Sequence, residues 1–461
     1  MNFYFFDIIL LIIFLIFISI FLYRNRKKLD REGILFIYRT KWGVKFIEKF
    51  SKKNKSLLNF LSYVSIIFGY IFMVFSIFFL IYSLKFMYSS KILPNVPPIM
   101  PIIPYVTQIF KIKFLPPLYF IYWMIILLVV AVSHEFAHGI FARFFNIKIR
   151  STGFGFLGPF ILAFVEPDEK TMQRKKIKQQ LAILSGGSFA NFIVALVFVI
   201  IIQLFLLIFS TPIGIQGYFF AAEYINISSI NSFDGYTLIE LINNSNISFP
   251  LKVNVNNQTY FLTKDLWEIQ KKILKENETD KILLYLDSPA YRSNLTGAII
   301  KIDGKPVKDL NEIYFMLKNK KPGDTVNIIT DKGNYTITLS EHPKNSSKGF
   351  LGISFIKPNK FAYFFSFQFF KFNPYIKIKP KINSDVFNFF KDLFYWMILI
   401  AISVALFNML PFSFLDGGRT SYLTLLYFLK NKKKASVAYY IFNFLIVLLI
   451  LLMFFIWLVK I

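Results

Sequence analysis

Six long apolar runs are the feature that most limits how this chain can fold. They cover residues 3–23, 57–86, 118–145, 181–209, 391–409 and 435–459. A helix of about 20 apolar residues crosses the hydrocarbon core of a bilayer. With 55% hydrophobic residues, the chain is also too apolar for a soluble globular protein. We therefore expect a polytopic α-helical membrane protein with about six transmembrane helices, embedded in a lipid bilayer.

Basic residues are concentrated in the short loops between these runs. Residues 24–55 carry twelve Lys and Arg, and residues 170–178 and 430–434 are also rich in Lys. Such loops stay on the cytoplasmic side, so we expect both termini outside. The same rule accounts for much of the net charge of +27, and we expect no nucleic-acid partner. Without cysteine, disulfides and thiolate metal sites are excluded.

The composition changes between residues 211 and 390, where the chain becomes polar and rich in Asn, with short β-like runs and turn signals. The predicted division of the chain is 1–117 for two spans, a basic loop and a Pro-rich outer segment; 118–210 for the first half of a membrane core; 211–284 for an extracytoplasmic segment; 285–356 for an α+β domain; 357–390 for a connector; and 391–461 for the second half of the core.

Two segments near the third apolar run have strong helix-breaking signals. Residues 87–117 hold seven prolines, from Pro94 to Pro117, so we expect a non-helical outer or re-entrant segment. Residues 147–169 hold Gly153, Gly155, Gly158 and Pro159 among alternating apolar residues. This pattern predicts a β-hairpin or a loop that dips into the membrane.

Two of the three histidines in the chain lie in the third apolar run, as His134-Glu135-Phe136-Ala137-His138. Positions four apart share one face of a helix, so both imidazoles can bind one zinc ion. Glu135 lies beside them, where it can take a proton from a metal-bound water. Ionisable groups at membrane depth are costly and usually functional. We interpret the motif as a Zn²⁺ site with Glu135 as the catalytic residue, rather than as two satisfied helix histidines.

A catalytic zinc ion needs a third protein ligand. The remaining histidine, His342, lies in the insertion, and we interpret it as a surface residue. Asp416 follows an apolar helix and precedes Gly417-Gly418, which by itself indicates only a turn. A carboxylate in this apolar setting needs a partner, and the topology places it at the same cytoplasmic-side depth as His134. We therefore expect Asp416 to be the third ligand.

These motifs together are similar to those of a known family. His134-Glu135-x-x-His138, with Asn408-x-x-Pro411-x-x-x-Leu415-Asp416-Gly417, resembles the site-2 protease family of intramembrane zinc metalloproteases, peptidase family M50. The resemblance implies that His134, His138 and Asp416 bind zinc and that Glu135 is the catalytic carboxylate. It extends from residue 118 to about residue 460, and the two N-terminal spans lie outside it.

Two asparagines are candidates for substrate binding. Gly187-x-x-x-Asn191 matches the small-residue motif of the family, although Ser185-Gly186 replaces the more usual Gly-Pro pair. Small residues alone would indicate close helix packing, but an amide in lipid needs a partner. The resemblance implies that Asn191 helps to hold the substrate strand, and Asn408 offers a second amide for the same purpose.

The second half of the insertion resembles a PDZ domain of the kind that membrane proteases carry. Ser288-Pro289-Ala290 is followed by a strand-like run, Asp303-Gly304, a helix-like stretch to about Lys318 and two further strand-like runs. Residues 227–243 faintly repeat residues 299–310, so a degenerate PDZ-like copy in 211–284 is a further hypothesis. The predicted fold class is thus a polytopic helical membrane protein with an inserted extracytoplasmic α+β PDZ-like domain.

The predicted function is a zinc metalloendopeptidase that cleaves transmembrane protein substrates within or next to their spans, as in regulated intramembrane proteolysis. One alternative is a membrane metalloprotease with a downstream glutamate as the third ligand. Another is a scaffold or receptor that acts through the PDZ-like domain, and a transporter is disfavoured because no clear inverted repeat is seen. The sequence leaves the substrate and the oligomeric state open.

Overall fold

The computed structural model describes residues 3–33, 35–89, 97–112, 115–158, 160–244, 246–256, 258–275, 279–355 and 376–460. Pro94, Pro159 and most of the predicted connector 357–390 lie outside these residues. The chain divides into two compact units. Unit 1 comprises Met1–Leu204 and Asn388–Ile461, and unit 2 comprises Phe205–Phe387.

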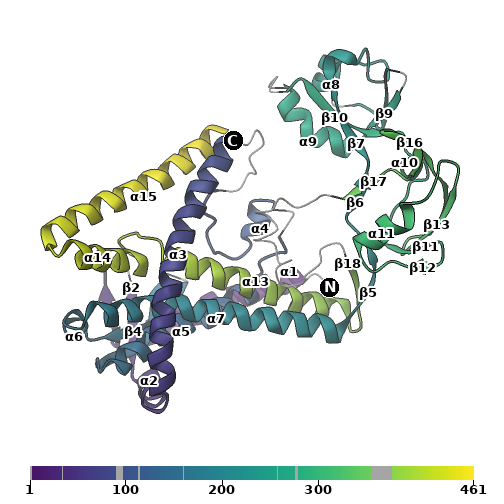
Figure 1. Cartoon of the computed structure of the whole chain (residues 1–461). Coiled ribbons are helices and arrows are strands. Elements are labelled where there is room, and N and C mark those ends of the chain that lie inside the picture. The colour runs from purple at the N-terminus through teal and green to yellow at the C-terminus, as the bar shows by residue number, and fades with distance from the viewer. Residues whose placement is uncertain are drawn as a thin grey trace. The chain divides into compact units, whose positions relative to one another are not determined.

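Six helices among the described residues are long and apolar enough to cross a membrane (Figure 1). They are α1 (Phe3–Asn25), α3 (Lys55–Ser89), α5 (Phe120–Phe144), α7 (Ile177–Phe209), α13 (Ser384–Asn408) and α15 (Lys432–Lys460). A helix satisfies all of its backbone polar groups internally, which hydrocarbon requires. The six predicted spans are confirmed as helices. The shorter helices around them are α2 (Trp42–Lys53), α4 (Val106–Ile109), α6 (Glu169–Gln173) and α14 (Asp416–Leu429).

A four-stranded antiparallel sheet lies in unit 1, in the order β1-β2-β3-β4. Its strands are β1 (Leu29–Glu32), β2 (Leu35–Thr40), β3 (Ile149–Leu157) and β4 (Phe160–Pro167). The hairpin predicted at 147–169 is confirmed as β3–β4. The basic loop at 24–55 is more than a loop, because it supplies β1, β2 and the amphipathic helix α2. Thr40 of β2 pairs with Thr152 of β3, a long-range pairing that local sequence patterns do not reveal.

The first span is held to the start of α5 by a buried carboxylate. Asp7 of α1 is 3% exposed. It accepts hydrogen bonds from the backbone N–H of Phe120 at 2.7 Å, from that of Ile121 at 3.0 Å and from the Tyr105 hydroxyl at 2.7 Å. The first N–H groups of a helix have no partner within the helix, and a negative charge there is stabilising. Asp7 therefore caps α5 from a different helix.

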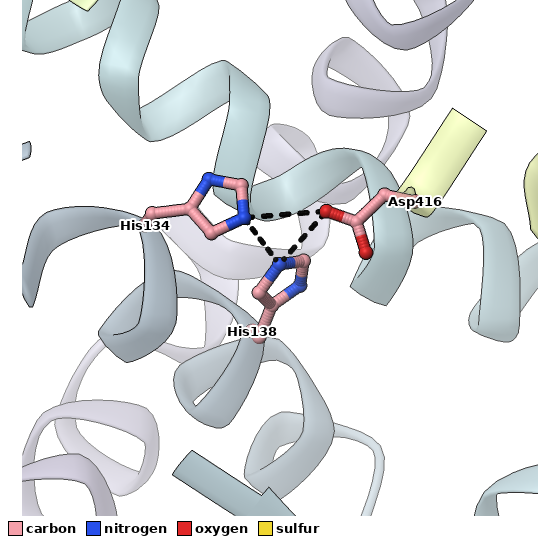
Figure 2. Close-up of side chains that lie close together, drawn as sticks. All are labelled: His134, His138 and Asp416. Atoms are coloured by element: carbon pink, nitrogen blue, oxygen red, sulfur yellow. Dashed lines mark hydrogen bonds and ion pairs between the residues drawn. The ribbon is translucent and has the colours of Figure 1, made fainter. Parts of the chain in front are cut away.

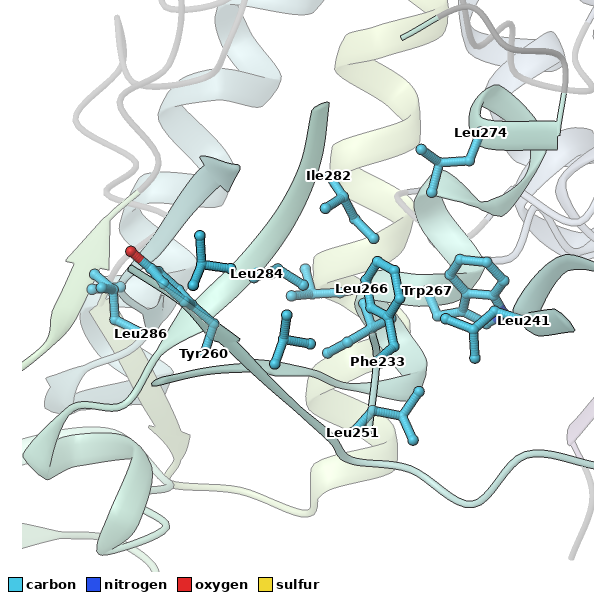
Figure 3. Close-up of a cluster of buried hydrophobic side chains, with 14 residues drawn as sticks. Phe233, Leu241, Leu251, Tyr260, Leu266, Trp267, Leu274, Ile282, Leu284 and Leu286 are labelled. Atoms are coloured by element: carbon cyan, nitrogen blue, oxygen red, sulfur yellow. The ribbon is translucent and has the colours of Figure 1, made fainter. Parts of the chain in front are cut away.

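One sheet of unit 2 has four strands in the order β7-β10-β9-β8. Its elements are β7 (Ala222–Asn226), α8 (Leu238–Asn243), β8 (Leu251–Val255), β9 (Gln258–Leu262), α9 (Lys264–Lys275) and β10 (Lys281–Leu286). One face of the sheet and the two helices enclose a core that includes Phe233, Leu241, Trp267 and Leu284 (Figure 3). Alternate residues of β8 and β10 are buried, as expected for a sheet with one wet face.

The second sheet of unit 2 has the order β14-β13-β11-β5-β18, with β12 paired to β11. Its strands are β5 (Ser210–Ile215), β11 (Ile299–Ile302), β12 (Lys305–Pro306), β13 (Thr325–Thr330), β14 (Asn334–Thr338) and β18 (Ile376–Pro380). Two smaller pairs are β6 (Tyr218–Phe220) with β17 (Ile353–Phe355) and β15 (Ser340–His342) with β16 (Asn345–Phe350). Helix α11 (Leu310–Leu317) follows β12, as the sequence pattern predicts.

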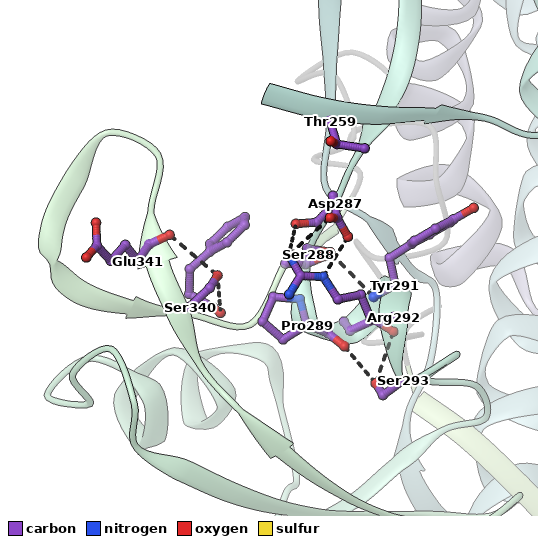
Figure 4. A network of polar contacts seen from close by, with 12 residues as sticks. Thr259, Asp287, Ser288, Pro289, Tyr291, Arg292, Ser293, Ser340 and Glu341 are labelled. Atoms are coloured by element: carbon purple, nitrogen blue, oxygen red, sulfur yellow. Dashed lines mark hydrogen bonds and ion pairs between the residues drawn. The ribbon is translucent and has the colours of Figure 1, made fainter. Parts of the chain in front are cut away.

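The predicted Ser-Pro-Ala motif forms the short helix α10 (Pro289–Arg292). The Ser288 hydroxyl accepts a hydrogen bond from the Tyr291 N–H at 3.4 Å, and Pro289 takes the first helical position. Arg292 pairs with both carboxylate oxygens of Asp287, at 2.6 and 3.1 Å (Figure 4). The motif thus ends β10 and starts the second half of the unit.

The two halves of unit 2 share an element order but not a strand order. In each, a turn with Asp-Gly at positive φ, namely Asp234-Gly235 or Asp303-Gly304, precedes a short helix and then a β-hairpin. The hairpin strand next to β11 is β13, whereas β10 separates β7 from the hairpin of the first half. The PDZ-like assignment and the degenerate copy both stay predictions.

Candidate metal centre

Helix α5 presents the two imidazoles of the motif on one face. The Nε2 atoms of His134 and His138 lie 3.0 Å apart (Figure 2). Their side chains are only 10% and 13% exposed. This juxtaposition follows from the helical repeat, since residues four apart are neighbours on a helix surface.

Asp416 reaches the same point from α14, of which it is the first residue. Its Oδ2 atom lies 3.2 Å from the Nε2 atom of each histidine. The two glycines that follow allow this approach. A Cβ at Gly417 would lie 2.2 Å from the Met409 carbonyl oxygen, and one at Gly418 would lie 2.2 Å from that of Phe412. The Asp-Gly-Gly sequence therefore packs α14 tightly against the segment that ends α13.

The three ligand atoms form a triangle with sides of 3.0, 3.2 and 3.2 Å. Tetrahedral zinc with bonds of about 2.0–2.1 Å needs ligand atoms about 3.3 Å apart, so the spacing fits. Two nitrogens and one oxygen leave one tetrahedral position open, which is typical of a catalytic site. Within the part of the chain that the structure describes, His134, His138 and Asp416 form a group of side chains that could hold a metal ion.

Both imidazoles are held at their other nitrogen. The Nδ1 atom of His138 lies 2.7 Å from the carbonyl oxygen of Ile183, which can only accept a hydrogen bond. A neutral His138 therefore carries its proton on Nδ1, which leaves the lone pair of Nε2 for a metal ion. The Nδ1 atom of His134 lies 3.3 Å from Nδ2 of Asn191. Such partners orient metal-binding imidazoles in many sites.

Glu135 is partly buried beside the triangle. Its Oε2 atom accepts a hydrogen bond from the backbone N–H of Val165 in β4, at 3.1 Å. The motif helix is thereby attached to the strand at the end of the four-stranded sheet. This hydrogen bond holds one carboxylate oxygen of Glu135. Its donor lies in β4, which is outside the His-Glu-x-x-His motif.

The family model for peptidase family M50 matches residues 122–452, which include the three ligand candidates and Glu135. The chain belongs to peptidase family M50. Members of family M50 are zinc metalloproteases. Together with the six apolar helices, this membership makes the chain an integral multi-pass membrane protein.

One curated relative is an uncharacterized protein of Methanocaldococcus jannaschii, 49% identical over 75 residues. The match covers 16% of this chain and 20% of the relative, so the chain spans one fifth of that protein. It therefore adds no activity to what M50 membership indicates.

Of the other residues considered in the sequence, Asn191 and Asn408 lie beside His134, whereas His342 lies in unit 2. Asn408 has its Nδ2 atom 3.4 Å from His134 Nε2, so it lies beside the candidate metal position. Asn191 is 0% exposed, with Oδ1 3.0 Å from the Ser133 hydroxyl. The substrate-binding roles of both stay predictions. His342 lies in β15 of unit 2, where it packs on Phe350 and accepts a hydrogen bond from the Lys344 N–H.

Several contacts of the M50 site could not be read from the sequence. The Ile183 carbonyl and the Val165 N–H are backbone groups, which carry no signal in a side-chain pattern. Arg419, three residues after Asp416, pairs with Glu169 of α6 through two contacts of 3.0 and 3.1 Å. This pair joins residues 250 positions apart in the chain.

Proposed function

We propose that this M50 protein hydrolyses peptide bonds within or next to the transmembrane segments of membrane-protein substrates. His134, His138 and Asp416 bind Zn²⁺, and Glu135 is the catalytic base. The observation that carries the proposal is the convergence of three ligand atoms within 3.2 Å from two different helices. A scaffold would need neither this triangle nor Glu135 beside it.

The protein residues divide the work of hydrolysis among them. When bound, zinc supplies a Lewis acid that activates water and polarises the scissile carbonyl. Glu135 accepts the proton of the attacking water and delivers it to the leaving amine. Its Oε2 atom is held by Val165, so the carboxylate keeps a fixed direction during both transfers. In this proposal the Asn408 amide, whose Nδ2 lies 3.4 Å from His134 Nε2, donates a hydrogen bond to the substrate carbonyl.

A helical substrate must unwind before its peptide bonds can be attacked. Strand β4 pairs with β3 on one side and ends the order of the four-stranded sheet among the described strands. An extended substrate can therefore add by backbone hydrogen bonds to the edge of β4 that faces away from β3, beyond the Val165 N–H that Glu135 occupies. Because Val165 of this strand contacts Glu135, such a substrate would run beside the catalytic base.

Unit 2 has the role of a filter in this proposal. We assign it to the extracytoplasmic side, with the M50 site toward the cytoplasm, because the basic loops of unit 1 obey the positive-inside rule. Its PDZ-like half would bind or exclude substrate ectodomains, so that only trimmed proteins reach the site, as in regulated intramembrane proteolysis. This part of the proposal rests on family analogy.

The test is cleavage of a panel of single-span proteins by the purified full chain in detergent. We expect defined products from the wild type, none after chelation of zinc, and recovery when zinc is added back. Glu135→Gln should give far less product than the wild type while it retains the metal. Equal product from the wild type and from Glu135→Gln would remove the assignment.

A further inference from the structure

Three positions of α7, four residues apart, face the two imidazoles of α5. The carbonyl oxygen of Ile183 lies 2.7 Å from His138 Nδ1. A Cβ at Gly187 would lie 2.4 Å from His138 Nε2 and 2.6 Å from His134 Cε1. The Asn191 amide lies 3.3 Å from His134 Nδ1. Residues i, i+4 and i+8 share one face of a helix, so one stripe of α7 meets both ligands.

The chemistry of a bound metal decides what Asn191 must do. An imidazole that binds metal through Nε2 carries its proton on Nδ1 and needs an acceptor there. His138 has such an acceptor in the Ile183 carbonyl. For His134 the neighbouring group is an amide, which offers an oxygen and a nitrogen at nearly equivalent positions. A 180° turn of the carboxamide exchanges the two atoms and brings Oδ1 to His134.

The neighbouring hydroxyl favours the turned amide. Ser133 Oγ lies 3.1 Å from the Val130 carbonyl and 3.0 Å from Asn191 Oδ1, and its single proton can serve only one of them. With the amide turned, Ser133 donates to Val130 and accepts from Asn191 Nδ2, while Asn191 Oδ1 accepts from His134 Nδ1–H. Every polar group of this buried set then has a partner, as buried groups require.

We propose that Ile183, Gly187 and Asn191 form a metal-support face of α7, in which Asn191 orients His134 through Oδ1 instead of binding substrate. Asn191 is 0% exposed and engaged at both ends of its amide, so a substrate strand could reach it only by displacing Ser133 and His134. Gly187 keeps the space in which the Nε2 atoms meet. Asn191 is thus a positioning residue, and this inference rests on the proposed zinc site.

The experiment measures the zinc affinity of the purified full chain by chelator competition, separately from cleavage. Asn191→Leu removes the acceptor at similar volume and should weaken zinc binding about 10- to 100-fold. Asn191→Asp keeps an oxygen toward His134 and should stay within a few-fold of the wild type. Gly187→Ala should weaken zinc binding strongly. Gly186→Ala is its matched control, because that Cβ would meet the Phe141 ring at 2.5 Å and not an imidazole.

The outcomes separate this inference from the proposed function. Wild-type zinc affinity in Asn191→Leu, together with a loss of cleavage, would overturn the inference and return Asn191 to substrate binding. Equal zinc loss in the Leu and Asp variants would also overturn it, because the oxygen would then not matter. A wild-type chain that binds no zinc would overturn both proposals. Affinity is measured per folded, monodisperse protein, so a variant with reduced yield still gives a result.

Discussion

The carboxylate of Glu135 accepts a hydrogen bond from the backbone N–H of Val165, at 3.1 Å. The two residues lie on different elements, the motif helix α5 and the end strand β4. Because the donor is a backbone group, the position of the strand sets the direction of the carboxylate. In this M50 protein the proposed catalytic base and the proposed substrate-binding edge are therefore joined by a direct hydrogen bond.

Replacement of Glu135 by Gln should separate chemistry from structure. Gln retains an oxygen that can accept from the Val165 N–H, so the fold and the zinc content should be unchanged. The turnover number should fall by about 10²- to 10⁴-fold, because the general base is lost. Initial cleavage rates with parallel metal analysis measure both effects. A variant that cleaves within twofold of the wild type would contradict the role of Glu135.

Replacement of Asp416 by Ala should remove the third ligand. Two imidazoles alone make an incomplete zinc site, so we expect loss of bound zinc and of cleavage. His342→Ala is the matched control, since His342 lies in unit 2, where it contacts Lys344 and Phe350. It should retain metal. Full zinc occupancy in Asp416→Ala would favour the alternative in which a glutamate is the third ligand.

Replacement of Asp7 by Ala should destabilise the membrane unit. The change leaves two N–H groups of α5 and the Tyr105 hydroxyl without their acceptor. Hydrogen bonds to charged groups contribute about 1.5–3 kcal/mol each, so the thermal midpoint in detergent should fall by several degrees or more. Asp30→Ala, which alters an exposed carboxylate paired with Arg39, should change it little. Similar midpoints for both variants would argue against the capping role.

The Arg419–Glu169 pair should contribute little to stability and be sensitive to salt. Both side chains are about half exposed, at 43% and 52%, and exposed pairs contribute about 0.2–1 kcal/mol. A double-mutant cycle with Arg419→Ala and Glu169→Ala measures the coupling, which should decrease in high salt. The exchanged pair, Arg419→Glu with Glu169→Arg, should recover part of it. A coupling well above this range would show a larger role for the contact near Asp416.

Unit 2 should lose stability in acid through Asp331. The hydrogen bond from Lys377 and the backbone N–H of Ala298 hold the pKa of this carboxyl below its usual range. A lowered folded-state pKa gives stability that is present above the unfolded value of about 3.9 and is lost as the pH falls toward the folded value. Hydrogen exchange of residues 325–338, corrected for intrinsic rates, should rise below about pH 4. Asp331→Asn should weaken this dependence, and an unchanged profile would contradict it.

The six spans, the β3–β4 hairpin and the two metal-facing histidines could be predicted because each depends on local spacing. An apolar run of sufficient length must form a helix in lipid, and His134 and His138 meet through the helical repeat alone. The position of Asp416 could not be predicted from local spacing. Its apolar surroundings and its motif indicated that it binds a partner from another part of the chain. Its distance of 3.2 Å from both imidazoles agrees with that expectation.

Other features were decided only by the tertiary structure. The pairing of β2 with β3, the capping of α5 by Asp7 and the meeting of Asn191 with His134 each join segments far apart in the chain. Side-chain periodicity shows which face of an element is buried, but not which partner buries it. Residue types and spacings thus predicted the candidate metal ligands and the number of membrane-spanning helices. Long-range packing alone decided which backbone and amide groups hold the ligands in place.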